Sequence, residues 1–153
     1  MTAHGLPRTA APMPSTPPVL SYLAFDFGVK RVGVASGNTL IRSATPLTSV
    51  AESGERRFEA IAALILQWQP DALVVGVPYH PDGAAHENTA RAQRFARRLQ
   101  GRFSLPVHEV DERYSTTQAR TARAKDLDAA SAAIILEQFL NTIECAQNDS
   151  PDT

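Results

Sequence analysis

The spacing of apolar residues divides the chain into short segments and predicts that strands come first. Three apolar runs occupy residues 19–27, 32–36 and 41–50. The turn signals between them fall at Gly28–Arg31 and at Gly37-Asn38. Runs of this length with such boundaries predict three strands in an antiparallel meander. The third run contains Pro46, which cannot donate a backbone hydrogen bond, so we expect it at an edge of the sheet.

After residue 50 the pattern alternates between helical and extended spacing. Apolar side chains three and four residues apart predict helices over residues 55–69, 89–103 and 128–144, with a shorter helix over 115–123. Short apolar runs predict strands over residues 72–77 and 106–110. A meander followed by strand, helix, strand, helix and strand predicts an α/β domain with a five-stranded mixed sheet flanked by helices.

The composition of the two ends sets the expected limits of this domain. Residues 1–18 contain five prolines, and we interpret them as a disordered N-terminal tail. Residues 146–153 are polar, and we interpret them as a flexible C-terminal tail. The domain itself is then expected to span residues 19–145, a length that suits one hydrophobic core.

Charge is distributed unevenly along the chain. The 153 residues carry a formal net charge of -1, but residues 91–125 contain eight arginines and one lysine against three acids. In the predicted helix over residues 89–103 the apolar stripe leaves four arginines facing outward: Arg91, Arg94, Arg97 and Arg98. A local basic surface of this kind is typical of contact with nucleic-acid phosphates.

The composition also excludes several classes of protein. Cys145 is the single cysteine, which excludes an internal disulfide and a cysteine-based zinc site. We expect Cys145 to be a half-buried helix residue and not a nucleophile. No apolar run approaches the ~20 residues of a membrane span, and residues 1–18 lack the apolar core of a signal peptide. We therefore expect a cytoplasmic protein that has no contact with a membrane.

Asp26 closes the first apolar run and is the first candidate site residue. A carboxylate among Tyr, Leu, Phe and Val is costly to bury unless a cation or a donor compensates it. A metal ion would be such a partner. The alternative is a structural role, in which Asp26 caps the following turn through the amides of Gly28 or Val29.

Asp128 opens the last predicted helix and is the second candidate. Four residues separate it from Ala132, so it lies in helical phase with Ile135 and Leu136 and is expected to face the sheet. An acid at a helix N-terminus is also favoured by the helix dipole alone. A capping role does not require the residue to face the core, and the phase therefore favours a site role.

Asp111-Glu112-Arg113 follows the last predicted strand and holds the third candidate acid. Strand alternation places Asp111 and Glu112 on opposite faces, so one of them at most can face Asp26. The pattern does not decide between them, and a solvated loop or an ion pair with Arg113 is the alternative. Three carboxylates from separate elements suit a hard cation that prefers oxygen, such as Mg²⁺ or Mn²⁺.

Other polar motifs carry less weight. His80 and His86 lie in a polar loop with Asp82 and Glu87, and we interpret this segment as a loop and not as a metal site. The chain has no glycine-rich phosphate loop of the GxxxxGK[ST] type. Asp26-Phe27-Gly28 matches a kinase trio by chance, because the other kinase signatures are missing.

Six motifs in this order resemble the YqgF/RuvX family of pre-16S rRNA nucleases and Holliday junction resolvases. They are AFDFGVKRVGVA (24–35), ATPL (44–47), VVGVP with DG (74–78 and 82–83), TARAQRFARRL (89–99), DERYST (111–116) and LDAASAAIILEQFL (127–140). Together they cover essentially residues 20–140. The segment Arg120–Leu127 is shorter than the basic, glycine-containing loop usual in the family, which affects expectations about substrate preference.

The resemblance implies an RNase H-like fold and a cytoplasmic, divalent-metal-dependent nuclease that matures the 5′ end of 16S ribosomal RNA. It implies that the catalytic, metal-binding acids are Asp26, Glu112 and Asp128, and so it selects Glu112 over Asp111. We expect substrate phosphates to contact Lys30, Arg31, Arg91, Arg94, Arg98 and Arg113.

Three functions fit this chain, and each makes a different prediction. The first is cleavage of precursor rRNA by a monomer or weak homodimer. The second is resolution of four-way DNA junctions in recombination, which requires symmetric cleavage by a dimer. The third is a non-catalytic RNA-binding assembly factor on the same fold, which the short segment before Asp128 motivates and the three intact acids oppose. We do not expect an actin-like ATPase, because it would need a second such domain and 153 residues leave no room for one.

Overall fold

The computed structural model describes residues 18–148 apart from Pro81, His86 and residues 112–126; for residues 144–148 it describes the backbone alone. Residues 1–17 and 149–153 of the expected tails lie outside the described residues, as does the predicted helix over 115–123.

Five strands form one mixed sheet in the order β3-β2-β1-β4-β5. They are β1 (Ser21–Asp26), β2 (Val32–Asn38), β3 (Ala44–Val50), β4 (Ala72–Val77) and β5 (Val107–Asp111). The first three strands pair antiparallel, whereas β1 with β4 and β4 with β5 pair parallel. The predicted meander and mixed sheet are confirmed, and β3, which contains Pro46, is an edge strand.

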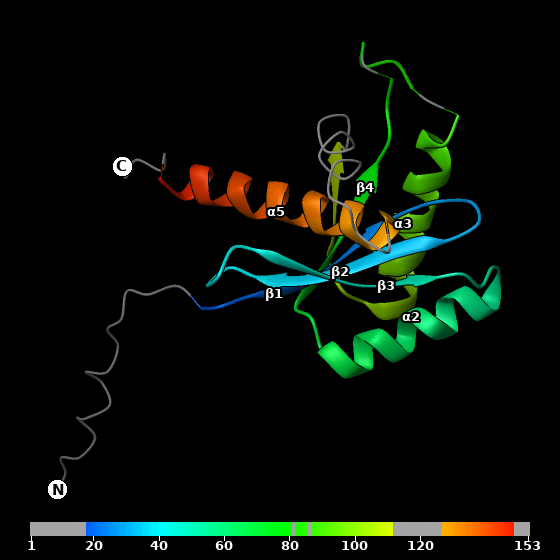
Figure 1. Cartoon of the computed structure of the whole chain (residues 1–153), viewed down its shortest axis with the longest axis horizontal. Helices are drawn as coiled ribbons and strands as arrows, with labels where there is room; N and C mark the ends of the chain where they lie inside the picture. The colour runs from blue at the N-terminus through cyan, green and yellow to red at the C-terminus, as the bar shows by residue number, and fades with distance from the viewer. Residues whose placement is uncertain (1–17, 81, 86, 112–126, 149–153) are drawn as a thin grey trace, which may run out of the picture.

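Helices cover both faces of this sheet (Figure 1). The structure describes α2 (Glu55–Trp68), α3 (Thr89–Phe103) and α5 (Leu127–Asn148). Figure 1 shows α5 on one side of the sheet and α2 on the other. Alternate residues of β1 divide between two cores: Leu23 and Phe25 pack with α2 and α3, whereas Tyr22 and Ala24 pack with α5.

The predicted helix faces are largely confirmed. Residues Ala92, Phe95, Ala96 and Leu99 of α3 are buried, and the arginines between them are exposed. In α5, Ala132, Ile135, Leu136 and Leu140 are buried as expected. In α2, Leu66 follows the same helical spacing as Phe58 and Ile61, which predicts that it is buried. That prediction is wrong, because Leu66 is 74% exposed.

The turn predicted at Gly37-Asn38 is also wrong, since both residues belong to β2. The chain reverses after them: the Asn38 carboxamide oxygen accepts hydrogen bonds from the amides of Leu40 and Ile41, and Arg42 has φ 57°. Gly37 is needed in the strand because a Cβ there would lie 2.8 Å from the backbone carbonyl oxygen of Ser43 and 3.0 Å from Leu136 Cδ2 of α5. The last helix continues to Asn148, past the predicted end at residue 144.

Within the described part of the chain, no helix is both long enough and apolar enough to span a membrane.

Candidate active site

The candidate site lies where four strands end and three helices begin. Because β2 runs antiparallel to both of its neighbours, β1, β3, β4 and β5 all point the same way, and their carboxyl ends meet at one edge of the sheet. Helix α2 follows β3, and the Thr89 hydroxyl at the start of α3 donates to the carbonyl of Pro78, directly after β4. Ligands of α/β sheets bind at such edges, and helix N-termini there favour anions.

Asp26 is the last residue of the central strand β1. It pairs with Gly33 of β2 on one side and with Gly76 of β4 on the other. Tyr22 and Ala24 pack against α5, so strand alternation places Asp26 on the α5 face too. Both cross-strand partners are glycines, so neither of them adds a side chain beside the partly buried Asp26.

Gly33 brings the start of α5 to Asp26. A Cβ placed on Gly33 would lie 1.9 Å from the carbonyl oxygen of Asp128 and 2.8 Å from the amide nitrogen of Ala129. The first turn of α5 therefore rests directly on the backbone of β2, beside the residue that pairs with Asp26. The structure thus brings together two of the three acids predicted from the sequence, Asp26 and Asp128.

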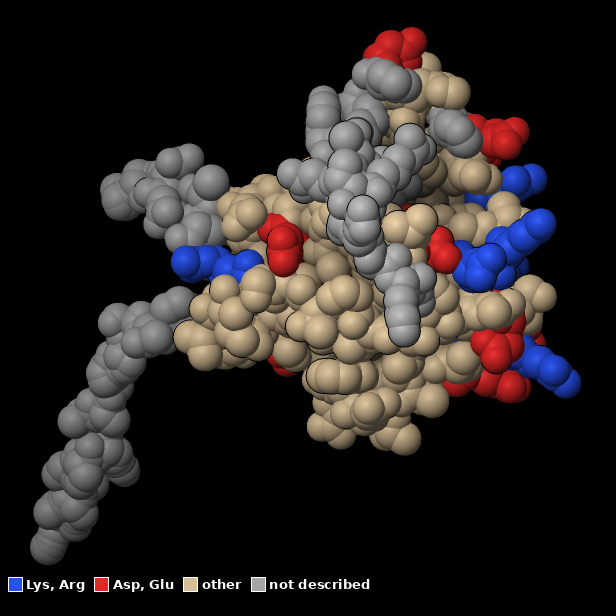
Figure 2. All heavy atoms as spheres, viewed as in Figure 1, with Lys and Arg blue, Asp and Glu red and all other residues tan. Residues whose placement is uncertain are grey.

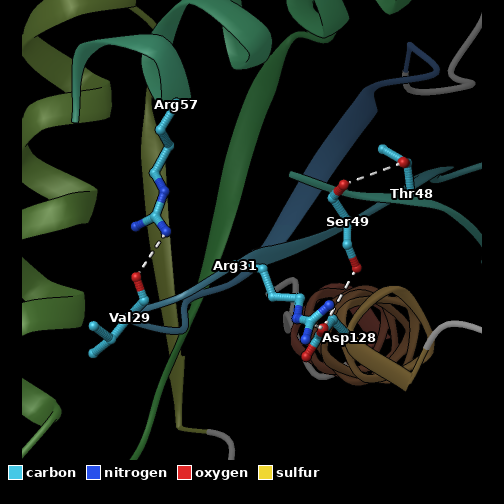
Figure 3. Close-up of polar contacts among 6 residues, drawn as sticks. All are labelled: Val29, Arg31, Thr48, Ser49, Arg57 and Asp128. Atoms are coloured by element: carbon cyan, nitrogen blue, oxygen red, sulfur yellow. Dashed lines mark hydrogen bonds and ion pairs between the residues drawn. The ribbon is translucent and has the colours of Figure 1, made fainter. Parts of the chain in front are cut away.

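Asp128 faces the sheet, as its helical phase predicts. Its Oδ2 lies 3.3 Å from Nε of Arg31 in an ion pair and 3.5 Å from the hydroxyl of Ser49, which donates to it. Figure 3 shows Arg31, directly before β2, and Ser49 of β3 reaching Asp128, with α5 seen end-on. The Asp128 side chain is 40% exposed, so the carboxylate is held in place and still open to solvent.

Asp111 ends β5 on the other face of the sheet. It pairs with Val77, which belongs to the core against α2 and α3, whereas Val110 packs with the α5 cluster. Asp111 is therefore directed away from the face that carries Asp26 and Asp128. The remaining acid of the pair, Glu112, lies outside the described residues, as does Arg113.

The donor set fits a divalent metal ion. Asp26 and Asp128 provide carboxylate oxygens on one face of the sheet, and Ser49 adds a hydroxyl within hydrogen-bond range of Asp128. Hard cations such as Mg²⁺ and Mn²⁺ prefer such oxygen ligands. Among the described residues no three acidic, histidine or cysteine side chains gather as a ready metal site.

The predicted basic contacts lie around this edge. Lys30 and Arg31 belong to the segment between β1 and β2, and Arg91, Arg94 and Arg98 are exposed on α3. Lys and Arg side chains visible in Figure 2 gather mainly at the right-hand end of the molecule, where Figure 1 places the β1–β2 turn and the start of α2.

The loop that contains His80 is held by hydrogen bonds within itself. The His80 amide donates to the carbonyl of Ala84, and the Asp82 carboxylate accepts from the amide of Ala84. His86 and the Cys145 side chain lie outside the described part.

Two contributors to the site were missed in the sequence. Gly33 carries a signal that could have been noticed, because Gly33, Ala35 and Gly37 form an alternating series of small residues on the face that meets α5. Ser49 carries none, since a serine near the end of an edge strand is common.

This arrangement of strands and helices is an RNase H-like fold of the RuvC type. The structure is similar to that of Thermus thermophilus RuvC in complex with a Holliday junction substrate, with a TM-score of 0.52 and 16% identity over 82% of this chain and 96% of that one. Residues 20–142 match the family described as "RuvX: Holliday junction resolvase", and the chain belongs to this family.

Relatives with high identity share this assignment. A Polaromonas protein named "Putative pre-16S rRNA nuclease" is 62% identical over 123 residues, which cover 80% of this chain and 89% of that protein. A Paraburkholderia phytofirmans protein with the same name is 56% identical over 126 residues, covering 78% and 86%. The family expected from the sequence motifs is therefore confirmed.

Proposed function

We propose that this protein is a divalent-metal-dependent endonuclease that cleaves precursor 16S ribosomal RNA during maturation of its 5′ end in the cytoplasm. The observation that carries the proposal is the contact of Gly33 with the start of α5, which sets Asp128 beside Asp26 at the carboxyl edge of the sheet. The name carried by relatives more than 50% identical to this chain supports the substrate.

Asp26 and Asp128 would hold the metal ion, with Glu112 as the third ligand. Glu112 is favoured because Asp111 lies on the opposite face of the sheet from Asp26. A divalent cation held by these acids would supply Lewis-acid chemistry, which activates water and stabilises the leaving oxygen of a phosphodiester.

The remaining roles belong to the chain itself. The first turn of α5 directs its amides toward this edge, where the dipole of a long helix favours a phosphate. Arg31 lies beside Asp128 and can contact a phosphate that arrives there. Lys30, Arg91, Arg94, Arg98 and Arg113 are proposed to contact the flanking phosphates.

The test is metal-dependent cleavage of a precursor 16S rRNA fragment by three purified variants. Asp26→Asn and Asp128→Asn are expected to lose cleavage by at least about a hundredfold, as expected when a metal-ion catalyst is lost. Glu109→Gln is the matched control, because Glu109 is an exposed acid on the edge strand β5, which β4 separates from β1. Cleavage by Asp26→Asn at the wild-type rate would overturn the proposal.

A junction resolvase is the second candidate, because the description of the matching family names Holliday junctions. Cleavage of a four-way DNA junction and of the rRNA precursor should be compared in the same buffer and at the same enzyme concentration. Symmetric junction cleavage by a dimer, with the rRNA left intact, would favour the resolvase. Tight RNA binding with no cleavage in Mg²⁺ or Mn²⁺ would favour an assembly factor.

A further inference from the structure

A cavity of about 380 Å³ lies on the face of the sheet opposite the carboxylates. It is bounded by the β1–β2 segment, the start of α2 and one side of α3. Three phenylalanines and Val29 supply its apolar surface, and four arginines supply its charge: Phe27, Phe58, Phe95, Arg57, Arg91, Arg94 and Arg98.

Among the described residues, no acid belongs to the lining of the cavity to balance these arginines. The guanidinium groups of Arg94 and Arg98 form no hydrogen bond or ion pair with any described residue. Glu52, Glu55 and Glu59 are the acids nearest to the cavity in sequence, and none of them is in its lining. Glu55 is bound by Arg102 at 2.6 Å and so is engaged elsewhere. Four positive charges concentrated without a counterion favour an anionic ligand.

Arg57 is the most informative of the four, because only 7% of its surface is exposed. Its Nε donates to the carbonyl of Glu52 and its Nη2 to the carbonyl of Val29, each at 3.0 Å. Among the described residues, nothing accepts a hydrogen bond from Nη1. Figure 3 shows Arg57 extending from α2 to Val29, while Asp128 lies across the strands.

Burying a guanidinium without a carboxylate partner costs free energy of desolvation, and Arg57 is buried in this way. Burial lowers the pKa of Arg57 below its ordinary value, which reflects the same uncompensated desolvation. A guanidinium does not deprotonate in proteins. The two carbonyl hydrogen bonds offset part of the cost of burying it, and a bound anion would offset more. The two carbonyl contacts fix the direction of the free nitrogen in advance, which lowers the entropy lost on binding.

The start of α2 adds a second source of positive potential. Gly54 precedes this helix of 14 residues, and no side chain caps it. Both Ser53 and Gly54 line the cavity. First-turn amides that no side chain satisfies are an established kind of phosphate donor.

The apolar surface distinguishes a nucleotide from a bare phosphate. The Phe27 ring lies 5.2 Å from the Phe95 ring between centroids, and the Arg57 guanidinium lies 5.7 Å from the Phe27 centroid. Aromatic and guanidinium planes together form a stacking surface for an unpaired base. The volume suits a ligand of nucleotide size, and a phosphate alone would leave most of it empty.

We propose that this cavity binds one unpaired nucleotide of a nucleic-acid strand, with the base against Phe27 and the phosphate against Arg57, Arg94 and Arg98. Phe27 follows Asp26 directly and, by strand alternation, belongs to the other face. A strand that crosses the carboxyl edge of β1 can therefore meet the acids on one face and this cavity on the other. The proposal deepens the proposed function and shares its assumption that a nucleic-acid strand reaches Asp26.

The test measures binding and not cleavage, so that it stands apart from the test of the nuclease. The full chain with Asp26→Asn is titrated with a fluorescent single-stranded RNA and with a blunt RNA duplex. Adding Arg94→Ala and Arg98→Ala together is expected to weaken single-strand binding by about tenfold or more, as for loss of two phosphate contacts. Duplex binding should change no more than it does in the control.

Arg97→Ala is the matched control, because Arg97 is an exposed arginine of the same helix that does not line the cavity. A base analogue whose fluorescence is quenched by stacking reports the second contact: quenching should occur in the Asp26→Asn chain and disappear when Phe27→Leu is added. Melting curves of every variant establish that it is folded.

Two outcomes would overturn the proposal. Equal losses for Arg97→Ala and for the Arg94→Ala, Arg98→Ala pair would mean that general surface charge holds the strand. Binding of a nucleoside monophosphate as tight as that of the oligonucleotide would mean that the cavity serves a free nucleotide. If the variants show no nuclease function but single-strand binding changes as expected, the binding role of the cavity is supported and the proposed enzyme activity is overturned.

Discussion

Gly33 and Asp128 touch through their backbones: a Cβ on Gly33 would stand 1.9 Å from the carbonyl oxygen of Asp128. This contact joins the antiparallel partner of Asp26 to the first turn of α5. Because Gly33 has no side chain, the backbone of α5 can approach β2 more closely than any side chain at this position would allow. The spacing between the two acids is set by this approach.

Gly33→Ala should therefore displace the start of α5. The overlap involves backbone atoms that cannot rotate away, and overpacking of this kind costs about 1–3 kcal/mol or more of unfolding free energy. We expect both lower stability in urea unfolding and weaker Mn²⁺ binding, measured by isothermal titration calorimetry.

Gly101→Ala is the matched control for this prediction. Gly101 lies in α3, and a Cβ there meets nothing within 4 Å. Alanine is favoured over glycine inside a helix, so this variant should gain about 0.5–1 kcal/mol and bind Mn²⁺ as the wild type does. Similar losses in both variants would show that the Gly33 contact is not special.

The Arg31–Asp128 ion pair leads to a second prediction. The guanidinium neutralises a proposed metal ligand, so its removal should raise the affinity for Mn²⁺ by about two- to fivefold, the range expected for an exposed ion pair. The same change should weaken RNA binding, because a phosphate contact is lost. Lys30→Ala is the control, and it should weaken RNA binding without raising Mn²⁺ affinity. Unchanged Mn²⁺ affinity in Arg31→Ala would show that the ion pair does not compete with the metal.

Much of the fold could be predicted because it depends on local patterns. The run Ala72–Val77 and the stripe on residues 89–103 are each buried as their periodicity predicts. The orientation of Asp128 was also accessible, since helical phase follows from sequence spacing alone. Burial of Leu66 was predicted wrongly, because the 14-residue helix α2 has more apolar side chains than the sheet covers.

The rest of the site depends on contacts between segments far apart in the sequence. Periodicity does not reveal that Gly33 meets Asp128, because 95 positions separate them. Nothing in the sequence around Arg57 indicates that it is buried, since an arginine beside Phe58 in a helix is normally exposed. The choice of Glu112 came from the family motif, and the register of Asp111 with Val77 adds only that Asp111 faces away from Asp26.

Tyr22 makes the stability depend on alkaline pH. Burial raises the pKa of its phenol above the ordinary value of about 10, and the Asp71 carboxylate raises it further. The neutral phenol therefore contributes stability that is fully present below pH ~10 and is lost as the pH rises through the folded-state pKa. Tyr22→Phe should flatten this alkaline loss, because phenylalanine has no hydroxyl to ionise. The ring itself can still pack edge-on against Phe139. Urea unfolding of both proteins at neutral and alkaline pH checks this, and identical alkaline losses would contradict it.

Arg57→Lys tests whether the cavity needs a guanidinium or only a charge. Lysine keeps the positive charge but has one nitrogen, which cannot serve the carbonyls of Glu52 and Val29 and also face a ligand. We expect a loss of about 1–3 kcal/mol in unfolding free energy from the abandoned carbonyl. Single-strand RNA affinity should fall by about tenfold, as for a charge-assisted hydrogen bond. Arg97→Lys, on the exposed side of α3, should change neither quantity. Wild-type RNA affinity in Arg57→Lys would mean that charge alone suffices, and the fixed geometry of this buried arginine would then have no part in binding.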